Sequence, residues 1–229
     1  MTPKKIALLT DSSADLRWDQ ARENNIFFVP LRILCEDGEY LDGVNITGPD
    51  IYQRLHNGEL PQTSLPRVED FSAKLREIFD LGYDGVIAVM LSSGLSGTYN
   101  LARILAGECA EQGYAMKVFD SVSGALGQGM TVLQLAEDIK NGMDWEELTE
   151  RRAPQLIANT YPFFSVDTLE YLVKGGRIGK VTAMAGTMLQ IKPVMHMDDE
   201  GHLINMSKAR GRKAALLALA DKVGELGED

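Results

Sequence analysis

The ten residues from Leu91 to Asn100 read LSSGLSGTYN and combine serines, glycines and a threonine without a charged side chain. Hydroxyl groups and the free N–H groups at a helix N-terminus donate hydrogen bonds to a carboxylate, and the helix dipole adds to the attraction. Gly94 and Gly97 carry no Cβ and would let the backbone approach such a group closely. The stretch is therefore a candidate carboxylate-binding loop.

Short apolar runs precede this loop and two others like it. Gly85–Met90 precedes the stretch above, Lys5–Thr10 precedes Asp11–Ser13, and Met116–Phe119 precedes Asp120–Gly124. Apolar runs that end in Ser/Gly loops and alternate with helical segments predict a parallel, doubly wound α/β sheet with helices on both faces. The three loops would then meet at the carboxyl edge of the sheet, where ligands bind.

The segments between these strands have helical or hairpin spacing. Val68, Phe71, Leu75 and Ile78 form one apolar stripe and predict a helix that ends near Gly82. Residues 14–23 are also compatible with a helix. Residues 26–46 contain two apolar segments around Glu36-Asp37-Gly38, which predict a hairpin outside the main sheet.

A change in composition after Thr160 predicts a domain junction, with a Rossmann-like domain over residues 1–160 and a smaller α/β domain over residues 161–229. Pro154 and Pro162 bracket the junction and disfavour one continuous helix there. The second region is locally basic. It is expected to form a hairpin around Asp198–Gly201 and a closing helix at KAALLALADKV.

Composition excludes several classes of protein. The chain has 229 residues and a formal net charge of −10, which disfavours nucleic-acid binding. The two cysteines, Cys35 and Cys109, have no spacing typical of a disulfide framework or a zinc site. IALL is too short for a signal peptide and no apolar stretch is long enough for membrane insertion, so we expect a cytoplasmic protein.

The loop could also belong to an enzyme. Gly94-Leu-Ser-Gly-Thr98 departs from a GxSxG nucleophile elbow at Thr98, and no histidine has the context of a catalytic base. A serine esterase that uses the Ser92–Ser96 loop stays an alternative, as does a regulatory protein that binds no lipid. There is no GxxxxGK[ST] nucleotide loop, and Asp198–Glu200 lack the ligand spacing of a calcium loop, so we expect no cofactor and no metal.

Five elements in order resemble the signatures of the DegV family of bacterial fatty-acid-binding proteins. They are DSSADL from Asp11, TSLP from Thr63, SSGLSGTY from Ser92, TLEYLVKGGRI from Thr168 and LQIKP from Leu189. The resemblance covers nearly the whole chain. It implies a two-domain protein that holds a long-chain fatty acid between its domains and presents it to a fatty acid kinase, without an active site of its own.

The resemblance also implies roles for individual residues. Thr63 and Ser93 would bind the carboxylate directly, with Ser64, Ser96 and Gly94 in the same wall, and Arg177 and Ser12 would lie near the head group or the domain interface. The residue types also suggest an acyl tunnel, because flexible thioethers suit a chain that bends; its candidate lining is Phe163, Phe164, Met184, Met188 and Ile191. Lys208, Arg210 and Arg212 would face the kinase.

Each role has a structural alternative. Ser64 could be a helix cap before Pro66. Asp11 and Asp120 could be caps or turn residues, and for these two we favour that interpretation. The apolar side chains could be ordinary core, and the basic ones could be solvated.

The chain departs from the family pattern at Arg67, where a serine is common, and at Leu101, where a small polar residue is common. It also reaches Asp229 without the glycine-rich, histidine-bearing loop of the family. We therefore expect one side of the head-group site to be incomplete.

Overall fold

The computed structural model describes residues 2–184 and 191–226. The chain divides into two compact units, Met1–Thr160 and Tyr161–Asp229. Each unit has its own sheets and its own buried residues, and each is described by itself below.

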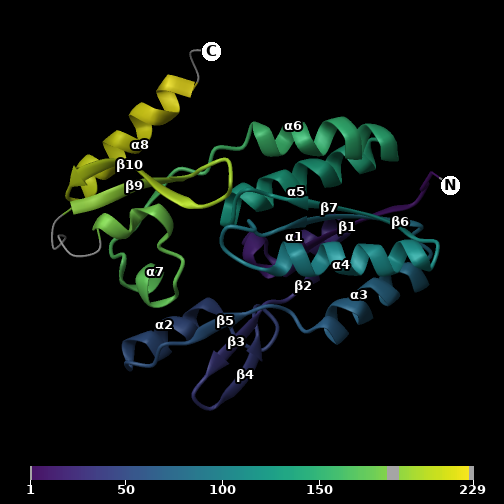
Figure 1. The fold of residues 1–229 in the computed structure, drawn as a ribbon, viewed down its shortest axis with the longest axis horizontal. Helices are drawn as coiled ribbons and strands as arrows, with labels where there is room; N and C mark the ends of the chain where they lie inside the picture. Colours follow the sequence, from purple (N-terminus) through teal and green to yellow (C-terminus); the bar gives the residue numbers. More distant parts are fainter. Residues whose placement is uncertain (1, 185–190, 227–229) are drawn as a thin grey trace. The chain divides into compact units, whose positions relative to one another are not determined.

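The first unit is built on a parallel four-stranded sheet with the strand order β2-β1-β6-β7 (Figure 1). The strands are β1 (Ile6–Asp11), β2 (Ile26–Val29), β6 (Gly85–Met90) and β7 (Ala115–Asp120). All six residues of β6 are buried, because helices cover the sheet on both faces. The parallel α/β sheet predicted from the apolar runs is confirmed.

Helices form a layer on each face of this sheet (Figure 1). On one face, α3 (Val68–Asp80) and α4 (Thr98–Glu111) bury Phe71, Leu75, Ile78 and Leu105 against the strands. On the other face lie α1 (Trp18–Glu23), α5 (Ala125–Lys140), the π-helical turn η2 (Glu147–Arg152) and α6 (Ala153–Ala158). The stripe predicted for α3 is thus the face that packs on the sheet.

Two predicted boundaries were wrong. Residues 14–23 do not form one helix, because a 3₁₀ turn, η1 (Ser12–Ala14), ends at Asp15 with φ 53° before α1 begins at Trp18. The segment Ile26–Val29 does not leave the main sheet. It pairs in parallel with β1, with Leu8 opposite Ile26.

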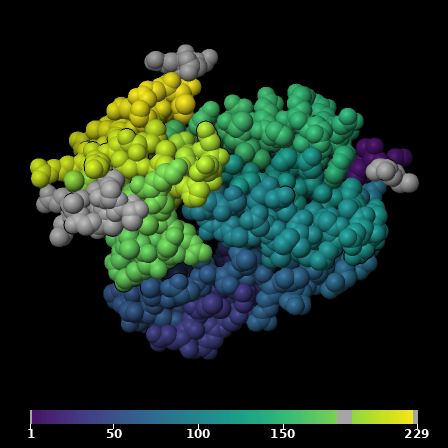
Figure 2. All heavy atoms as spheres, in the orientation of Figure 1, coloured from purple at the N-terminus to yellow at the C-terminus, as the bar shows by residue number. Residues whose placement is uncertain are grey.

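A lobe of the first unit contains a smaller antiparallel sheet with the order β4-β3-β5. Its strands are β3 (Arg32–Cys35), β4 (Gly38–Leu41) and β5 (Gln62–Ser64), and α2 (Gly48–His56) belongs to the same lobe. Figure 1 shows the lobe in purple and blue beside the main sheet, and its atoms have the same colours in Figure 2. The predicted hairpin around Glu36–Gly38 is confirmed as β3 and β4.

The second unit contains an antiparallel sheet with the order β10-β9-β8. Its elements are β8 (Phe164–Ser165), α7 (Glu170–Lys174), the 3₁₀ helix η3 (Gly179–Met184), β9 (Ile191–Met197), β10 (Leu203–Arg210) and α8 (Arg212–Leu226). Val194, Ala209 and Ala215 form the buried contact between α8 and the sheet. The predicted hairpin and closing helix are both present. In the described part of the chain, no helix has the length and apolar content needed to cross a membrane.

Candidate functional site

The candidate loop lies at the point where the strand order of the main sheet reverses. The chain leaves β1 toward β2 on one side and leaves β6 toward β7 on the other, so the switch point falls between β1 and β6. Ligands of open α/β sheets bind at the carboxyl ends of the strands at such a point. Asp11 ends β1 and accepts a hydrogen bond from the Leu91 amide, 2.8 Å away, just after β6. This carboxylate therefore bridges the two strands at the switch point.

Asp11 is fully buried and belongs to a polar network. It accepts from the amide and the hydroxyl of Ser13, and the Ser13 hydroxyl also lies 2.9 Å from Gln128 Oε1. Gln128 Nε2 donates to Thr10 Oγ1, which donates to the Val89 carbonyl. Burial raises the pKa of the Asp11 carboxyl, and the hydrogen bonds from Leu91 and Ser13 act in the opposite direction. Asp11 is thus a turn residue, as expected, and also an anchor for the next loop.

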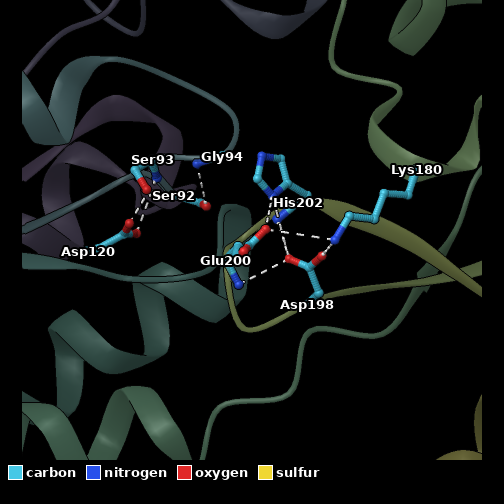
Figure 3. A network of polar contacts seen from close by, with 8 residues as sticks. All are labelled: Ser92, Ser93, Gly94, Asp120, Lys180, Asp198, Glu200 and His202. Carbon is cyan, nitrogen blue, oxygen red and sulfur yellow. Dashed lines mark hydrogen bonds and ion pairs between the residues drawn. The ribbon is translucent and has the colours of Figure 1, made fainter.

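A second carboxylate holds the middle of the candidate loop. Asp120, at the end of β7, accepts from the Ser93 amide at 3.2 Å (Figure 3). It also accepts from the Val122 amide at 2.9 Å. The Ser92 amide donates to the Ser123 carbonyl at 2.9 Å. The loops after β6 and β7 are therefore tied together, and the convergence predicted for the serine loops is confirmed.

Most amides that precede α4 are already used within the protein, so the predicted free N–H groups are limited to the start of the helix. The amides of Ser92 and Ser93 are used as described above. The Gly94 amide donates to Ser92 Oγ (Figure 3), and the amides of Leu95 and Ser96 donate to the Ser92 carbonyl. The Thr98 amide donates to Ser96 Oγ at 3.3 Å. Among the described residues, the amides of Gly97, Tyr99 and Asn100 at the start of α4 have no acceptor, so they are left as donors to a ligand together with side-chain hydroxyls.

The predicted hydroxyls fall into two groups. Thr63 and Ser93 are exposed, and within residues 2–184 and 191–226 neither hydroxyl has a hydrogen-bond partner. Ser64 and Ser96 are half-buried and engaged: Ser64 Oγ accepts from Arg32 at 2.7 Å, and Ser96 Oγ lies 2.9 Å from Thr98 Oγ1. Thr63 and Ser93 are therefore the two hydroxyls of the set that are open to a ligand.

The segment that carries Thr63 is a strand rather than a helix cap. Ser64 lies in β5, and the N-cap position of α3 is Arg67, whose side chain makes no capping bond, so the helix-cap interpretation of Ser64 was wrong. Neighbouring residues of a strand point to opposite faces of its sheet, so the prediction that Thr63 and Ser64 line the same wall of the site was wrong. Leu65 then packs at the candidate loop: a Cβ at Gly97 would lie 3.3 Å from Leu65 Cδ1. The two hydroxyl-bearing segments are in direct contact there.

Ser12 has a structural place in this unit. Its hydroxyl accepts from the Leu31 amide at 3.0 Å and forms a hydrogen bond with the carboxylate of Asp42. Burial raises the pKa of the Asp42 carboxyl, and the bond from Ser12 opposes that shift. Ser12 therefore connects the end of β1 to the start of the lobe.

Sequence reasoning missed Arg32. Its guanidinium donates from Nε to the Leu65 carbonyl at 2.6 Å, from Nη2 to Ser64 Oγ, and from Nη1 to Glu39 at 3.0 Å. Glu39 also pairs with Arg67 at 2.7 Å. A single arginine inside IFFVPLRIL carries no motif. Its partners in the segment that carries Thr63 lie 32 and 33 positions away, so only the pairing of β3 with β5 could have identified its role there.

The predicted residues of the second unit are placed as follows. Arg177 is half-buried and donates to the Gly175 carbonyl at 2.6 Å. Phe163, Phe164 and Ile191 are half-buried, with the Phe163 ring 4.8 Å from that of His196. Met184 ends η3, and Met188 lies outside the described residues. Lys208, Arg210 and Arg212 are exposed, at the end of β10 and the start of α8.

The turn between β9 and β10 is closed by a charged cluster. Asp198 accepts from Lys180 Nζ at 2.6 Å and from the amides of Glu200 and His202 (Figure 3). The bond from Lys180, followed by those from the turn amides, lowers the pKa of Asp198 to about 2. The ligand atoms of Asp198, Glu200 and His202 are close enough together to hold a metal ion. The Lys180 ammonium group, however, also lies 3.8 Å from Glu200, so it already pairs with both carboxylates.

Comparison with known proteins gives a consistent result. The family described as "Uncharacterised protein, DegV family" matches residues 5–229. A DegV domain-containing protein of Clostridium perfringens is 39% identical over 222 residues, which are 97% of this chain and 78% of that protein.

Two solved structures extend the comparison. A DegV family protein from Thermus thermophilus, described by its fatty acid binding, is 34% identical with a TM-score of 0.84, and the match covers 95% of this chain and 77% of that one. A stearic acid-binding protein from Eubacterium ventriosum is 28% identical with a TM-score of 0.85, and covers 98% and 78% of the two chains.

Proposed function

This chain belongs to the DegV family, and on that premise we propose that it binds a long-chain fatty acid and presents the carboxylate to a fatty acid kinase in the cytoplasm. The observation that carries the proposal is a pair of exposed hydroxyls, those of Thr63 and Ser93, which have no hydrogen-bond partner among the described residues. They lie on two segments that meet at Leu65 and Gly97. In the proposal these hydroxyls donate to the two carboxylate oxygens. The fatty acids held by solved relatives support the choice of ligand.

The head group and the tail contribute differently. A hydrogen bond to a charged group contributes about 1.5–3 kcal/mol. Burial of about fifteen methylenes at ~0.8 kcal/mol each gives a gross figure of about 12 kcal/mol. The tail therefore dominates the affinity, and we propose that Phe163, Phe164, Met184, Met188 and Ile191 contribute to its binding. The hydroxyls set the position of the head.

A carboxylate held by neutral hydroxyls keeps its nucleophilic oxygen available for transfer of a phosphoryl group from a partner kinase. A bidentate arginine pair would engage both oxygens more strongly. In the proposal, the kinase supplies the nucleotide site, while Lys208, Arg210 and Arg212 face the kinase and Arg177 lies near the head group. The exposure of the first three side chains supports this assignment.

The test is mass spectrometry of an organic extract of the purified protein, followed by uptake of added stearic acid by the delipidated chain. We expect about one fatty acid per chain in the wild type and depletion in a Thr63→Ala, Ser93→Ala double variant. Ser72→Ala, which removes a hydroxyl from the body of α3, is the matched control. A wild type that is empty and takes up no fatty acid would refute the proposal.

The same samples distinguish an esterase. A serine nucleophile needs a base to activate it, and among the described residues no histidine bonds to the Ser93 hydroxyl. Turnover of an acyl ester that disappears in Ser93→Ala would favour that alternative.

A further inference from the structure

The small sheet of the lobe places a guanidinium beside the segment that carries Thr63. Arg32 is opposite Ser64 in the pairing of β3 with β5, so their side chains lie on the same face. Its three hydrogen bonds go to Ser64, Leu65 and Glu39. Only 21% of the Arg32 side chain is exposed, so these bonds are largely shielded from water.

We propose that Arg32 is a positioning residue for the anionic head group: it fixes Ser64 and Leu65 against the serine loop and supplies a positive charge to that side of the site. The inference rests on the proposed function. It adds a residue to which neither the sequence motifs nor the comparisons assign a role.

The positioning follows from the direction of the hydrogen bonds. A guanidinium can only donate, so Ser64 Oγ accepts from Arg32, and this bond holds the Ser64 hydroxyl on the face of β5 opposite to that of Thr63. The bond from Nε holds the Leu65 carbonyl, and the Leu65 side chain is the one that packs at Gly97. Arg32 therefore holds the backbone of the residue that forms the contact between the two hydroxyl-bearing segments.

The charge follows from the composition of the cluster. Arg32 and Arg67 share a single carboxylate, Glu39, at 3.0 and 2.7 Å, so the three side chains carry one net positive charge. The other arginine of the lobe with the same exposure, Arg54, pairs with two carboxylates, Asp37 and Glu59, and that group has one net negative charge. The two clusters thus provide a natural comparison: the one in contact with Ser64 is positive and the other is not.

A merely structural Arg32 and a charged, positioning Arg32 predict different results for charged and neutral ligands. We would measure the dissociation constants of stearic acid and of 1-octadecanol, which has the same chain and no charge, for the delipidated protein at pH 8. We expect Arg32→Gln to weaken stearic acid about tenfold, equivalent to 1.4 kcal/mol, and the alcohol less than about twofold. Arg54→Gln, the matched control, should change the ratio of the two constants by less than about twofold.

Two further variants keep the test informative if Arg32→Gln folds poorly. Glu39→Gln keeps both arginines and removes the opposing charge, so it should strengthen stearic acid binding about threefold without a comparable change for the alcohol. Arg32→Lys keeps the charge without the fork of donors, so it should retain the preference for the acid over the alcohol.

Equal weakening of acid and alcohol in Arg32→Gln, or weaker acid binding in Glu39→Gln, would overturn the inference while fatty acid binding by the wild type stands. A wild type that binds neither ligand would instead refute the proposed function, and this inference with it.

Discussion

Gly129 of α5 offers a sharp test of how the buried network supports the candidate loop. A Cβ at this position would lie 2.3 Å from the carbonyl oxygen of Ala14 and 3.1 Å from Leu16 Cδ2. The closest atom is backbone, so it cannot rotate away as the end of a flexible side chain could. Gly129→Ala must therefore displace either α5 or the turn that follows Asp11.

The magnitude can be set against an ordinary helical glycine. Gly107 of α4 is exposed, and a Cβ there would meet nothing within 4 Å. Gly107→Ala should stabilise the protein by about 0.8–1 kcal/mol, because alanine has the higher helix propensity. Gly129→Ala has the same propensity gain but also overpacks a buried contact, which typically costs about 1–3 kcal/mol. The two variants should therefore differ by about 1–3 kcal/mol, with Gly129→Ala the less stable.

Urea unfolding followed by circular dichroism gives the comparison through the midpoint concentration, provided that the slope is unchanged. A displaced Ala14 also moves Ser13 and loosens the contact between Asp11 and Leu91, so we expect Gly129→Ala to take up stearic acid more weakly than Gly107→Ala. An unfolding midpoint for Gly129→Ala equal to or above that of Gly107→Ala would show that the contact between α5 and the turn is loose, and would refute the reasoning.

Two more predictions concern the carboxylates of the turns. The pKa of Asp198 is lowered from 3.8 to about 2 in the folded chain, so its ionised form contributes stability above pH 3.8 that is lost as the pH falls toward 2. Wild type should therefore melt at a higher temperature than Asp198→Asn at pH 6, and the difference should vanish near pH 2; a difference that does not change with pH would contradict this. Asp120→Ala removes the acceptor of the Ser93 and Val122 amides, so amide hydrogen exchange over residues 92–94 should become faster while exchange in β1 stays unchanged. Faster exchange in β1 as well would indicate global destabilisation and would contradict a local role for Asp120.

Much of the fold could be predicted because its strands and helices carry strong local patterns. Gly85–Met90 is apolar throughout and is buried throughout, as a strand between two helical layers must be. The apolar stripe in Val68–Asp80 correctly predicts which side chains of α3 are buried against the sheet. The segment IFFV was misassigned because an apolar run of four residues does not distinguish a hairpin strand from a parallel one. In the structure it pairs in parallel with β1.

The position of Ser64 illustrates why β5 was missed. Gln62-Thr63-Ser64 has no alternating pattern of its own and follows a proline, so capping of the next helix was a reasonable local interpretation. Its strand conformation comes from pairing with Arg32 to Leu34, which is a contact between segments about thirty residues apart. Pairings of this kind depend on the whole fold and leave little trace in a short window of sequence.

The same limit applies to the candidate site, where residue types could be predicted and their availability could not. A run of serines and glycines after a strand indicates donors for an anion, but whether each donor is free depends on partners elsewhere in the chain. Asp11 and Asp120 fit their local role as turn residues, yet each also accepts from the loop after β6 and so removes amides from the set open to a ligand. Of the hydroxyls predicted to bind the carboxylate, those of Thr63 and Ser93 are the ones for which the fold supplies no partner in the described part of the chain. A polar loop therefore marks where a ligand binds, and the long-range contacts decide which of its atoms are open to bind it.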